Sequence, residues 1–125
     1  MKLLDTTVAI DHLRGAEPAR ALIQGLLRED ERIVASETVR YELLAGVQAD
    51  ELDALEDFFS TLTWFPVRED VARAAGALAR HYRSSHVGID DLDYLIGATA
   101  LLLDAELLTT NVKHFPMLEG LEPAY

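Results

Sequence analysis

The sequence predicts an α/β fold, with three layers in the order α/β/α and a mainly parallel central sheet of four to five strands. The opening run Met1–Leu4 lacks a two-residue alternation and ends on the carboxylate of Asp5, as expected for a strand covered on both faces. Similar short apolar runs then alternate with amphipathic helical segments along the chain. Its 125 residues, half of them hydrophobic, are enough for one buried core, so we expect a single domain over residues 1–125.

Composition excludes several classes of protein. The chain has no cysteine, which rules out a disulfide framework and a thiolate metal site and is compatible with the reducing cytoplasm, where we expect it to work. Its longest nearly apolar run, Tyr94–Leu103, is shorter than the roughly 18 residues that span a bilayer, so we expect no membrane partner. Proteins that bind the phosphate backbone broadly have a basic face, and the formal charge of −11 argues against one here. It indicates either solubility or acids clustered to hold divalent cations or attract a basic partner.

In the first half of the chain, helix ends are marked by capping residues. Gly15 closes the first helix, and Ser36 is a good N-cap for the helix after the second strand, with Gly46 as its C′ residue. Between residues 50 and 60, apolar side chains recur at helical spacing and acids face outward. The predicted elements are the helices Val8–Arg14 and Glu17–Arg28, the strand Ile33–Ala35, and the helices Glu37–Ala45 and Asp50–Ser60.

The second half repeats this alternation. Pro66 stops a third strand, and a long Ala-rich helix follows with acids at its start and arginines near its end, as the helix dipole favours. A nearly apolar helix then leads to the last strands. The predicted elements are the strand Leu62–Phe65, the helices Glu69–Ser84 and Asp90–Leu103, the strand Glu106–Thr109 and a short edge strand at Leu121–Pro123.

Acidic and polar residues recur where predicted strands end. Asp5 ends the first strand, and Glu42 lies on a small, mostly apolar face of the helix after the second. Asp93 lies where the last long helix enters the core, and Gly97 leaves space beside it. The fourth strand ends in Thr109, Thr110 and Asn111. Because functional crevices of such sheets lie at the carboxyl ends of the strands, these side chains are candidates for one site.

Each residue also has a purely structural interpretation. Asp5 and Asp90 suit N-caps, Asp91 suits a first-turn dipole partner, Glu42 suits an exposed helix position and Asn111 suits a turn. Their convergence would be costly, because two carboxylates at 4 Å repel by about 1 kcal/mol in water and about 4 kcal/mol at an effective dielectric of 20. Three gathered acids need a proton or a cation, and all-oxygen ligands favour Mg²⁺ or Mn²⁺.

Four segments, in this order, resemble the sequence blocks of PIN-domain proteins, particularly the VapC-type toxins of bacterial toxin–antitoxin pairs. The blocks are Leu4–Asp11, Val39–Gly46, Asp93–Ala100 and Leu108–Phe115. The resemblance spans nearly the whole chain and implies a PIN-like fold. It implies an Mg²⁺-dependent endoribonuclease (Mn²⁺ being the other candidate ion) that hydrolyses RNA phosphodiester bonds.

By this resemblance Asp5, Glu42 and Asp93 match the three main acids of the family, and Asn111 falls at the fourth position. Asp5 and Asp93 would hold the ion directly or through water, and Glu42 would complete the shell or orient the attacking water. Asp90 could contribute from one turn earlier. Thr6 or Thr110 would hydrogen-bond the scissile phosphate. The sequence departs from the family at two positions, with His114 where an acid is frequent and Gly97 where Ala is usual.

The resemblance also implies partners: an RNA substrate, a VapB-type antitoxin with a basic tail that enters the site, and assembly as a homodimer or a toxin–antitoxin hetero-oligomer. Two apolar faces could support dimers but are more often plain core: Leu22, Ile23, Leu26 and Leu27, and Leu52, Leu55 and Phe59. Arg73, Arg80 and Arg83 could face the RNA backbone, although a solvated helix surface explains them better.

Three other readings are less favoured. Aspartyl phosphatases need a second Asp where this chain has Thr7, and receiver domains need an adjacent acid pair. A non-catalytic PIN-fold module that binds RNA or protein predicts the loss of a main acid, whereas all three are present.

Overall fold

The computed structural model describes residues 1–125 and contains one sheet of four parallel strands in the order β3-β2-β1-β4. Lys2 pairs with Ile33 on one side and with Glu106 on the other. The elements are β1 (Lys2–Leu4), α1 (Thr6–Leu13), α2 (Glu17–Arg28), β2 (Ile33–Ser36), α3 (Glu37–Gly46), η1 (Ala49–Glu51), α4 (Leu52–Phe59), β3 (Thr63–Phe65), α5 (Glu69–Tyr82), α6 (Asp91–Leu103), β4 (Glu106–Leu108) and η2 (Val112–His114).

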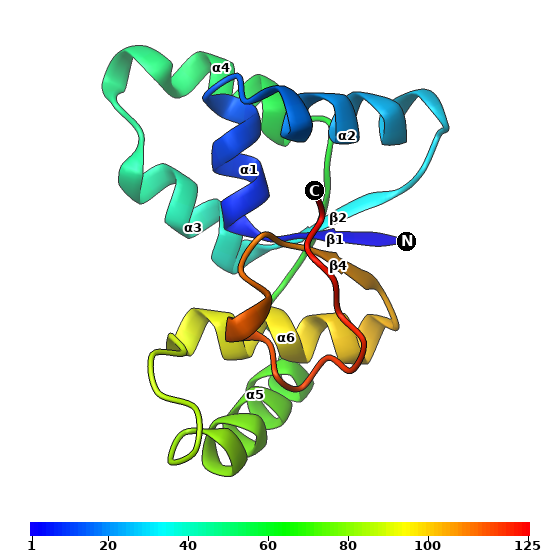
Figure 1. Cartoon of the computed structure of the whole chain (residues 1–125). Coiled ribbons are helices and arrows are strands. Elements are labelled where there is room, and N and C mark those ends of the chain that lie inside the picture. The colour runs from blue at the N-terminus through cyan, green and yellow to red at the C-terminus, as the bar shows by residue number, and fades with distance from the viewer.

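Helices lie on both sides of this sheet, which confirms the three-layer prediction (Figure 1). Helices α1, α2 and α4 lie on one side, and α6 lies on the other with α5 packed outside it. The main core contains Leu3 and Leu4 of β1 and Ile96 and Ala100 of α6, all nearly inaccessible to solvent. A smaller cluster around Tyr94 joins α5 to α6.

Capping side chains determine where three helices begin. Asp5 caps α1 by accepting a hydrogen bond from Thr6 N, and Ser36 caps α3 by accepting one from Thr38 N. Asp90 caps α6, and the Asp93 side chain accepts a bond from the backbone N–H of Asp90 in return. Such reciprocal capping satisfies backbone groups that a helix end leaves open. These caps place Asp5 and Asp93 at helix starts beside the ends of the strands.

Several predicted boundaries were wrong. Residues Leu121–Pro123 form no strand, so the sheet has four strands, and Ala124 N donates to Thr109 O as an isolated contact. The first helix begins at Thr6 because Asp5 caps it, and Gly46 is the last residue of α3 rather than its C′ residue, since Val47 follows in an extended conformation. Residues 50–60 divide into η1 and α4, and α5 ends at Tyr82. None of the helices is long and apolar enough to cross a membrane.

Candidate active site at the carboxyl ends of the strands

Asp5 is the most enclosed carboxylate of the candidate site, with 3% of its surface exposed. Its Oδ1 accepts a hydrogen bond from Thr6 N at 2.8 Å. Its Oδ2 accepts bonds from Thr109 Oγ1 at 2.6 Å and from Thr7 Oγ1 at 3.0 Å. Three donors thus compensate the loss of water around this side chain and fix the orientation of both oxygens.

The two threonines also connect the ends of β1 and β4. Thr109 Oγ1 accepts a bond from Asn111 N at 2.9 Å, and Thr7 Oγ1 accepts one from Thr110 N at 3.3 Å. The hydroxyls of Thr7 and Thr109 lie 3.4 Å apart. Thr109 was expected only as one of the polar groups at the end of the fourth strand, and neither hydroxyl was predicted to bond Asp5. The available signal was the recurrence of adjacent threonines at the ends of two predicted strands.

Glu42 reaches Asp5 through a single residue. Thr6 donates its backbone N–H to Asp5 and its Oγ1 hydroxyl to Glu42 Oε1 at 2.9 Å, and so links β1 to α3. Burial raises the pKa of the half-buried Glu42 carboxyl, and repulsion from Asp5, Asp93 and Asp90 raises it further, whereas the bond from Thr6 opposes the shift. Glu42 is therefore a carboxylate in a site where negative charge accumulates.

Asp93 faces this group from the first turn of α6, with its side chain 17% exposed. Its Oδ2 lies 2.8 Å from Nδ1 of His114, and the same nitrogen lies 3.0 Å from Nδ2 of Asn111. Burial raises the pKa of Asp93, and its repulsion by Asp5 adds to this, while the His114 contact opposes it. The charge of Asp5 thus contributes to the raised pKa of both Glu42 and Asp93, so these carboxylates lie close enough to form one site.

The chemistry of this donor set fits a hard divalent cation. The site offers carboxylate oxygens whose repulsion a cation would relieve, together with the side chain of Asn111. No three His, Cys, Asp or Glu side chains already converge tightly enough to surround one ion. Magnesium is commonly held by one or two carboxylates, with water and substrate phosphates filling its other positions, and this arrangement suits that mode.

Other candidate residues lie in varied positions. Asp90 is exposed and caps α6 through Leu92 N, and Thr110 is exposed at the end of β4. Thr6 is buried with its hydroxyl directed to Glu42. The expected space beside Gly97 is filled, because a Cβ on that residue would lie 2.8 Å from Sδ of Met117.

The three arginines for which both RNA contact and a solvated helix surface were possible lie on solvated surfaces. Arg73 pairs with Glu69, Arg83 pairs with Asp91 and Arg80 is exposed. Most of the apolar faces considered for dimer contacts are core instead. Ile23 and Leu55 are buried, and only Leu27 and Leu52 expose about two fifths of their surface.

A groove of about 500 Å³ begins at Glu42 and runs between α1, α3, η1 and α4. Ile10, Leu13 and Leu43 contribute apolar walls, and the acids Asp50 and Glu51 also line it. Arg14 is the one cation in its lining, so the acids leave the groove with a net negative charge beside its apolar surface. Glu42, an acid of the candidate site, is part of the same lining.

Several known proteins are similar to this chain in sequence and in fold. The PIN domain family model matches residues 2–118. Ribonuclease VapC19 of Mycobacterium tuberculosis (strain ATCC 25618 / H37Rv) is 62% identical over 125 residues, the full length of both chains. Ribonuclease VapC10 of the same strain is 39% identical, covering 100% of this chain and 93% of that protein. A solved toxin–antitoxin complex from Klebsiella pneumoniae aligns with a TM-score of 0.80 and 26% identity, covering 100% of this chain and 98% of the matched chain.

Proposed function

The chain belongs to the PIN domain family, and on that premise we propose that it is a metal-dependent endoribonuclease, the toxin of a VapBC-type toxin–antitoxin pair. It hydrolyses RNA phosphodiester bonds. One observation carries the proposal: Asp5, Glu42 and Asp93 come from three separate elements, and Thr6 links the first two by hydrogen bonds. Burial, with a smaller contribution from repulsion among the acids, raises the pKa of Glu42 and Asp93. Carboxylates that are gathered despite their mutual repulsion are typical of a functional site.

Asp5 and Asp93 would hold the ion, directly or through water, and Asn111 or Asp90 would be available to complete its surroundings. When bound, a divalent cation polarises a phosphoryl oxygen and activates a water. Mg²⁺ is the proposed ion because it binds through few carboxylates and retains water, and Mn²⁺ is the alternative with the same ligand preference.

The remaining groups position the reactants. Glu42, held by Thr6, orients the attacking water. The Thr6 hydroxyl already donates to Glu42, so the exposed Thr110 hydroxyl is the better donor to the scissile phosphate. Thr7 and Thr109 keep Asp5 oriented. In the reaction the water oxygen bonds to phosphorus as the bond to the leaving oxygen breaks. One proton leaves the water, and the leaving oxygen gains one.

The partner that neutralises this activity is a VapB-type antitoxin. The groove beside Glu42 supports this assignment, because its apolar walls suit an amphipathic segment and its acids suit a basic one. An Arg side chain reaching Glu42 from the groove would form a charge-assisted pair and compete with the cation. The toxin forms a homodimer or a toxin–antitoxin hetero-oligomer and acts in the cytoplasm.

The test is cleavage of total RNA by the purified chain, freed of copurifying protein, with Mg²⁺, Mn²⁺ or EDTA. Asp5→Asn and Asp93→Asn are expected to abolish discrete fragments that require the ion. Asp91→Asn is the matched control, since this exposed acid lies two residues from Asp93 in the same helical turn and pairs with Arg83.

Cleavage that persists in EDTA, or in a folded Asp93→Asn variant, contradicts the metal-dependent mechanism. Loss of cleavage in Asp91→Asn would show that general loss of charge, and not the site, explains the effect. Absence of cleavage by a chain that mass spectrometry shows to be free of partner would favour a non-catalytic binding module.

A further inference from the structure

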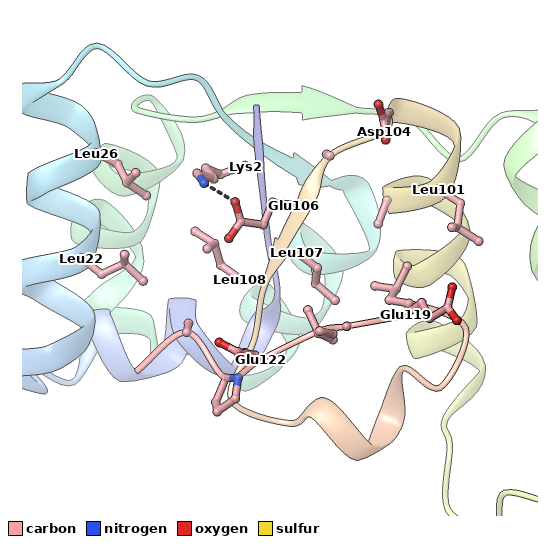
Figure 2. Close-up of a pocket in the computed structure, with 17 residues that line it drawn as sticks. Lys2, Leu22, Leu26, Leu101, Asp104, Glu106, Leu107, Leu108, Glu119 and Glu122 are labelled. Atoms are coloured by element: carbon pink, nitrogen blue, oxygen red, sulfur yellow. Dashed lines mark hydrogen bonds and ion pairs between the residues drawn. The ribbon is translucent and has the colours of Figure 1, made fainter.

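Two pockets of the molecule are acidic, so neither suits the phosphates of an RNA substrate. The pocket along β4 has a volume of about 590 Å³ and lies between α2, α6 and the C-terminal segment (Figure 2). Four carboxylates line it, and its one cation, Lys2, is paired with Glu106. The groove beside Glu42 also has more acids than bases in its lining. Both pockets would repel phosphate groups, which leaves another surface to hold RNA beside the candidate site.

One long stretch of the chain contains no acid. Residues 71–89 are the longest run without Asp or Glu, in a chain that has 22 of them. The run covers most of α5 and nearly all of the α5–α6 loop, residues 83–90. This loop lies on the side of the molecule where the parallel strands end (Figure 1). It leads into the cap of α6, where Asp90 N donates to Asp93 Oδ2 at 3.4 Å. An acid-free surface thus borders an acid of the candidate site.

Three aromatic rings gather where α5 ends. The Tyr82 ring lies edge-on to the rings of His81 and His86, with centroids 4.6 Å and 5.3 Å from its own. His81 and His86 are exposed, and Tyr82 is half-buried against the small cluster around Tyr94. Val87, next in the loop, is 95% exposed. We call His81, Tyr82, His86 and Val87 the aromatic patch.

Hydrogen bonds hold this patch in place. Tyr82 O accepts bonds from Ser85 N at 3.1 Å, from His86 N at 2.8 Å and from Ser85 Oγ at 3.3 Å. The Ser85 hydroxyl also lies 2.9 Å from His86 Nδ1, which orients the imidazole ring. Gly88 then turns the chain, at a φ of +92°, toward Ile89, which packs on the same small cluster as Tyr82. Because the loop is already folded, a ligand of these rings has little conformational entropy to remove.

The chemistry of the patch restricts its occupant. It has no carboxylate with which a basic partner segment could pair, and the neighbouring Arg83 is already paired with Asp91 at 2.9 Å. Its rings suit an unpaired nucleobase, because every base has a π-face that stacks on aromatic side chains. Stacking requires no net positive charge, which suits a chain whose formal charge is −11.

We propose that the aromatic patch binds a base of single-stranded RNA by stacking, chiefly on His86. This inference rests on the proposed ribonuclease function and assigns a substrate-binding surface to it. A base held there places the adjoining RNA backbone at the start of α6, beside Asp93. His86 takes no part in bond cleavage, so its loss weakens substrate binding and leaves the chemical step unchanged.

The test is a fluorescence anisotropy titration of the full chain in EDTA, with a short labelled RNA of mixed sequence and with an abasic sugar–phosphate chain of the same length. We expect only the RNA to bind. His86→Ala should weaken this binding roughly tenfold, which corresponds to about 1.4 kcal/mol, and His86→Tyr should restore most of the affinity. In cleavage assays with Mg²⁺, His86→Ala should raise KM with little change in kcat.

The matched control is Leu101→Ala, which truncates another exposed side chain near the opposite end of α6. The inference is overturned if this control weakens binding equally, if the abasic chain binds as well as the RNA, or if His86→Ala retains the wild-type KM. A His86→Ala variant that binds RNA normally but no longer retains a VapB-type antitoxin would assign the patch to a protein and also overturn it. Because binding is measured without the ion, a chain that binds RNA through His86 but cleaves none would contradict the proposed function and support this surface.

Discussion

Glu42 is a carboxylate that destabilises the metal-free fold at neutral pH. Because its folded pKa is raised, the folded chain binds this proton more tightly than the unfolded chain does. Between the unfolded pKa, about 4.3, and the raised folded pKa, stability therefore falls as pH rises, and above the folded pKa the full penalty applies. Ionised Glu42 thus favours a bound cation over the metal-free state.

Glu42→Gln should accordingly stabilise the chain in EDTA while abolishing RNA cleavage. The glutamine oxygen still accepts the Thr6 hydroxyl, and the repulsive charge is gone. We expect a gain of about 0.5 kcal/mol after allowing for solvent screening, seen as a higher Tm at neutral pH that approaches the wild-type value near pH 4. Glu122→Gln, an exposed control outside the site, should change neither quantity, and a lower Tm for Glu42→Gln would contradict this account.

Thr109 is expected to act through Asp5. Its hydroxyl is fully buried and donates to Asp5 Oδ2 at 2.6 Å, so Thr109→Val keeps the shape but leaves a buried carboxylate without that donor. The cost should be about 1.5–3 kcal/mol in urea unfolding, together with weaker Mn²⁺ binding in calorimetry. Thr109→Ser retains the donor and should recover most of both losses; failure to do so would assign the effect to packing.

His114 occupies a position from which a fourth carboxylate could reach the site, since its Nδ1 lies 2.8 Å from Asp93 Oδ2. His114→Asp should lower Tm in EDTA, because it replaces a favourable contact with repulsion, and should enlarge the rise in Tm caused by Mn²⁺. Lys113→Asp introduces an acid at the adjacent exposed position and serves as control. If Mn²⁺ raised Tm by the same extra amount in both variants, the effect would be a general attraction of the cation to added negative charge.

Within the helices, Gly76 weakens α5 without a compensating role. It is an exposed residue in the helix interior, and a Cβ there would meet no atom within 4 Å. Gly76→Ala should therefore stabilise the chain by up to about 1 kcal/mol, or several degrees in Tm, with unchanged cleavage. Gly88→Ala provides the contrast, because its φ of +92° strains an L-residue and predicts a lower Tm. Similar shifts in both would refute the conformational explanation.

The sequence predicted the type and order of the elements well because capping residues and apolar periodicity are local properties. Ser36 and Asp90 act as the predicted caps. The prediction of an edge strand at Leu121–Pro123 was wrong, since pairing with β4 depends on the path of the preceding loop. The expectation of free space beside Gly97 was also wrong, because Met117, from a loop distant in sequence, fills it.

At the scale of the molecule, contacts distant in sequence assemble the candidate site. Asp5 meets Thr109 across 104 positions, and Asp93 meets His114 across 21. The ends of parallel strands predicted which acids to consider, but hydrogen-bond partners such as Thr7 and Thr109 depend on side-chain orientation, which no local pattern encodes. The roles of these residues in binding the ion and RNA remain predictions.

The net charge of the whole chain leads to a prediction about salt. Five of its 11 Lys and Arg residues are paired with acids, and the chain as a whole has 22 acids, so it carries no net positive charge to replace counterions on RNA. The five paired residues are Lys2, Arg40, Arg68, Arg73 and Arg83. A protein that neutralises several phosphates loses affinity steeply as salt rises, with a slope of about −0.7 per contact for single strands. We expect kcat/KM for RNA cleavage at fixed Mg²⁺ to stay nearly constant as KCl increases.

A basic partner should respond in the opposite way. Negative potential accelerates its encounter with the chain, and salt screens that attraction, so the association rate of an Arg-rich peptide should fall as KCl rises. Stopped-flow fluorescence with such a peptide, alongside cleavage assays in the same buffers, measures both effects. A steep loss of RNA cleavage with salt would reveal a phosphate-binding surface that the paired arginines do not provide, and would require RNA contacts from elsewhere in the assembly.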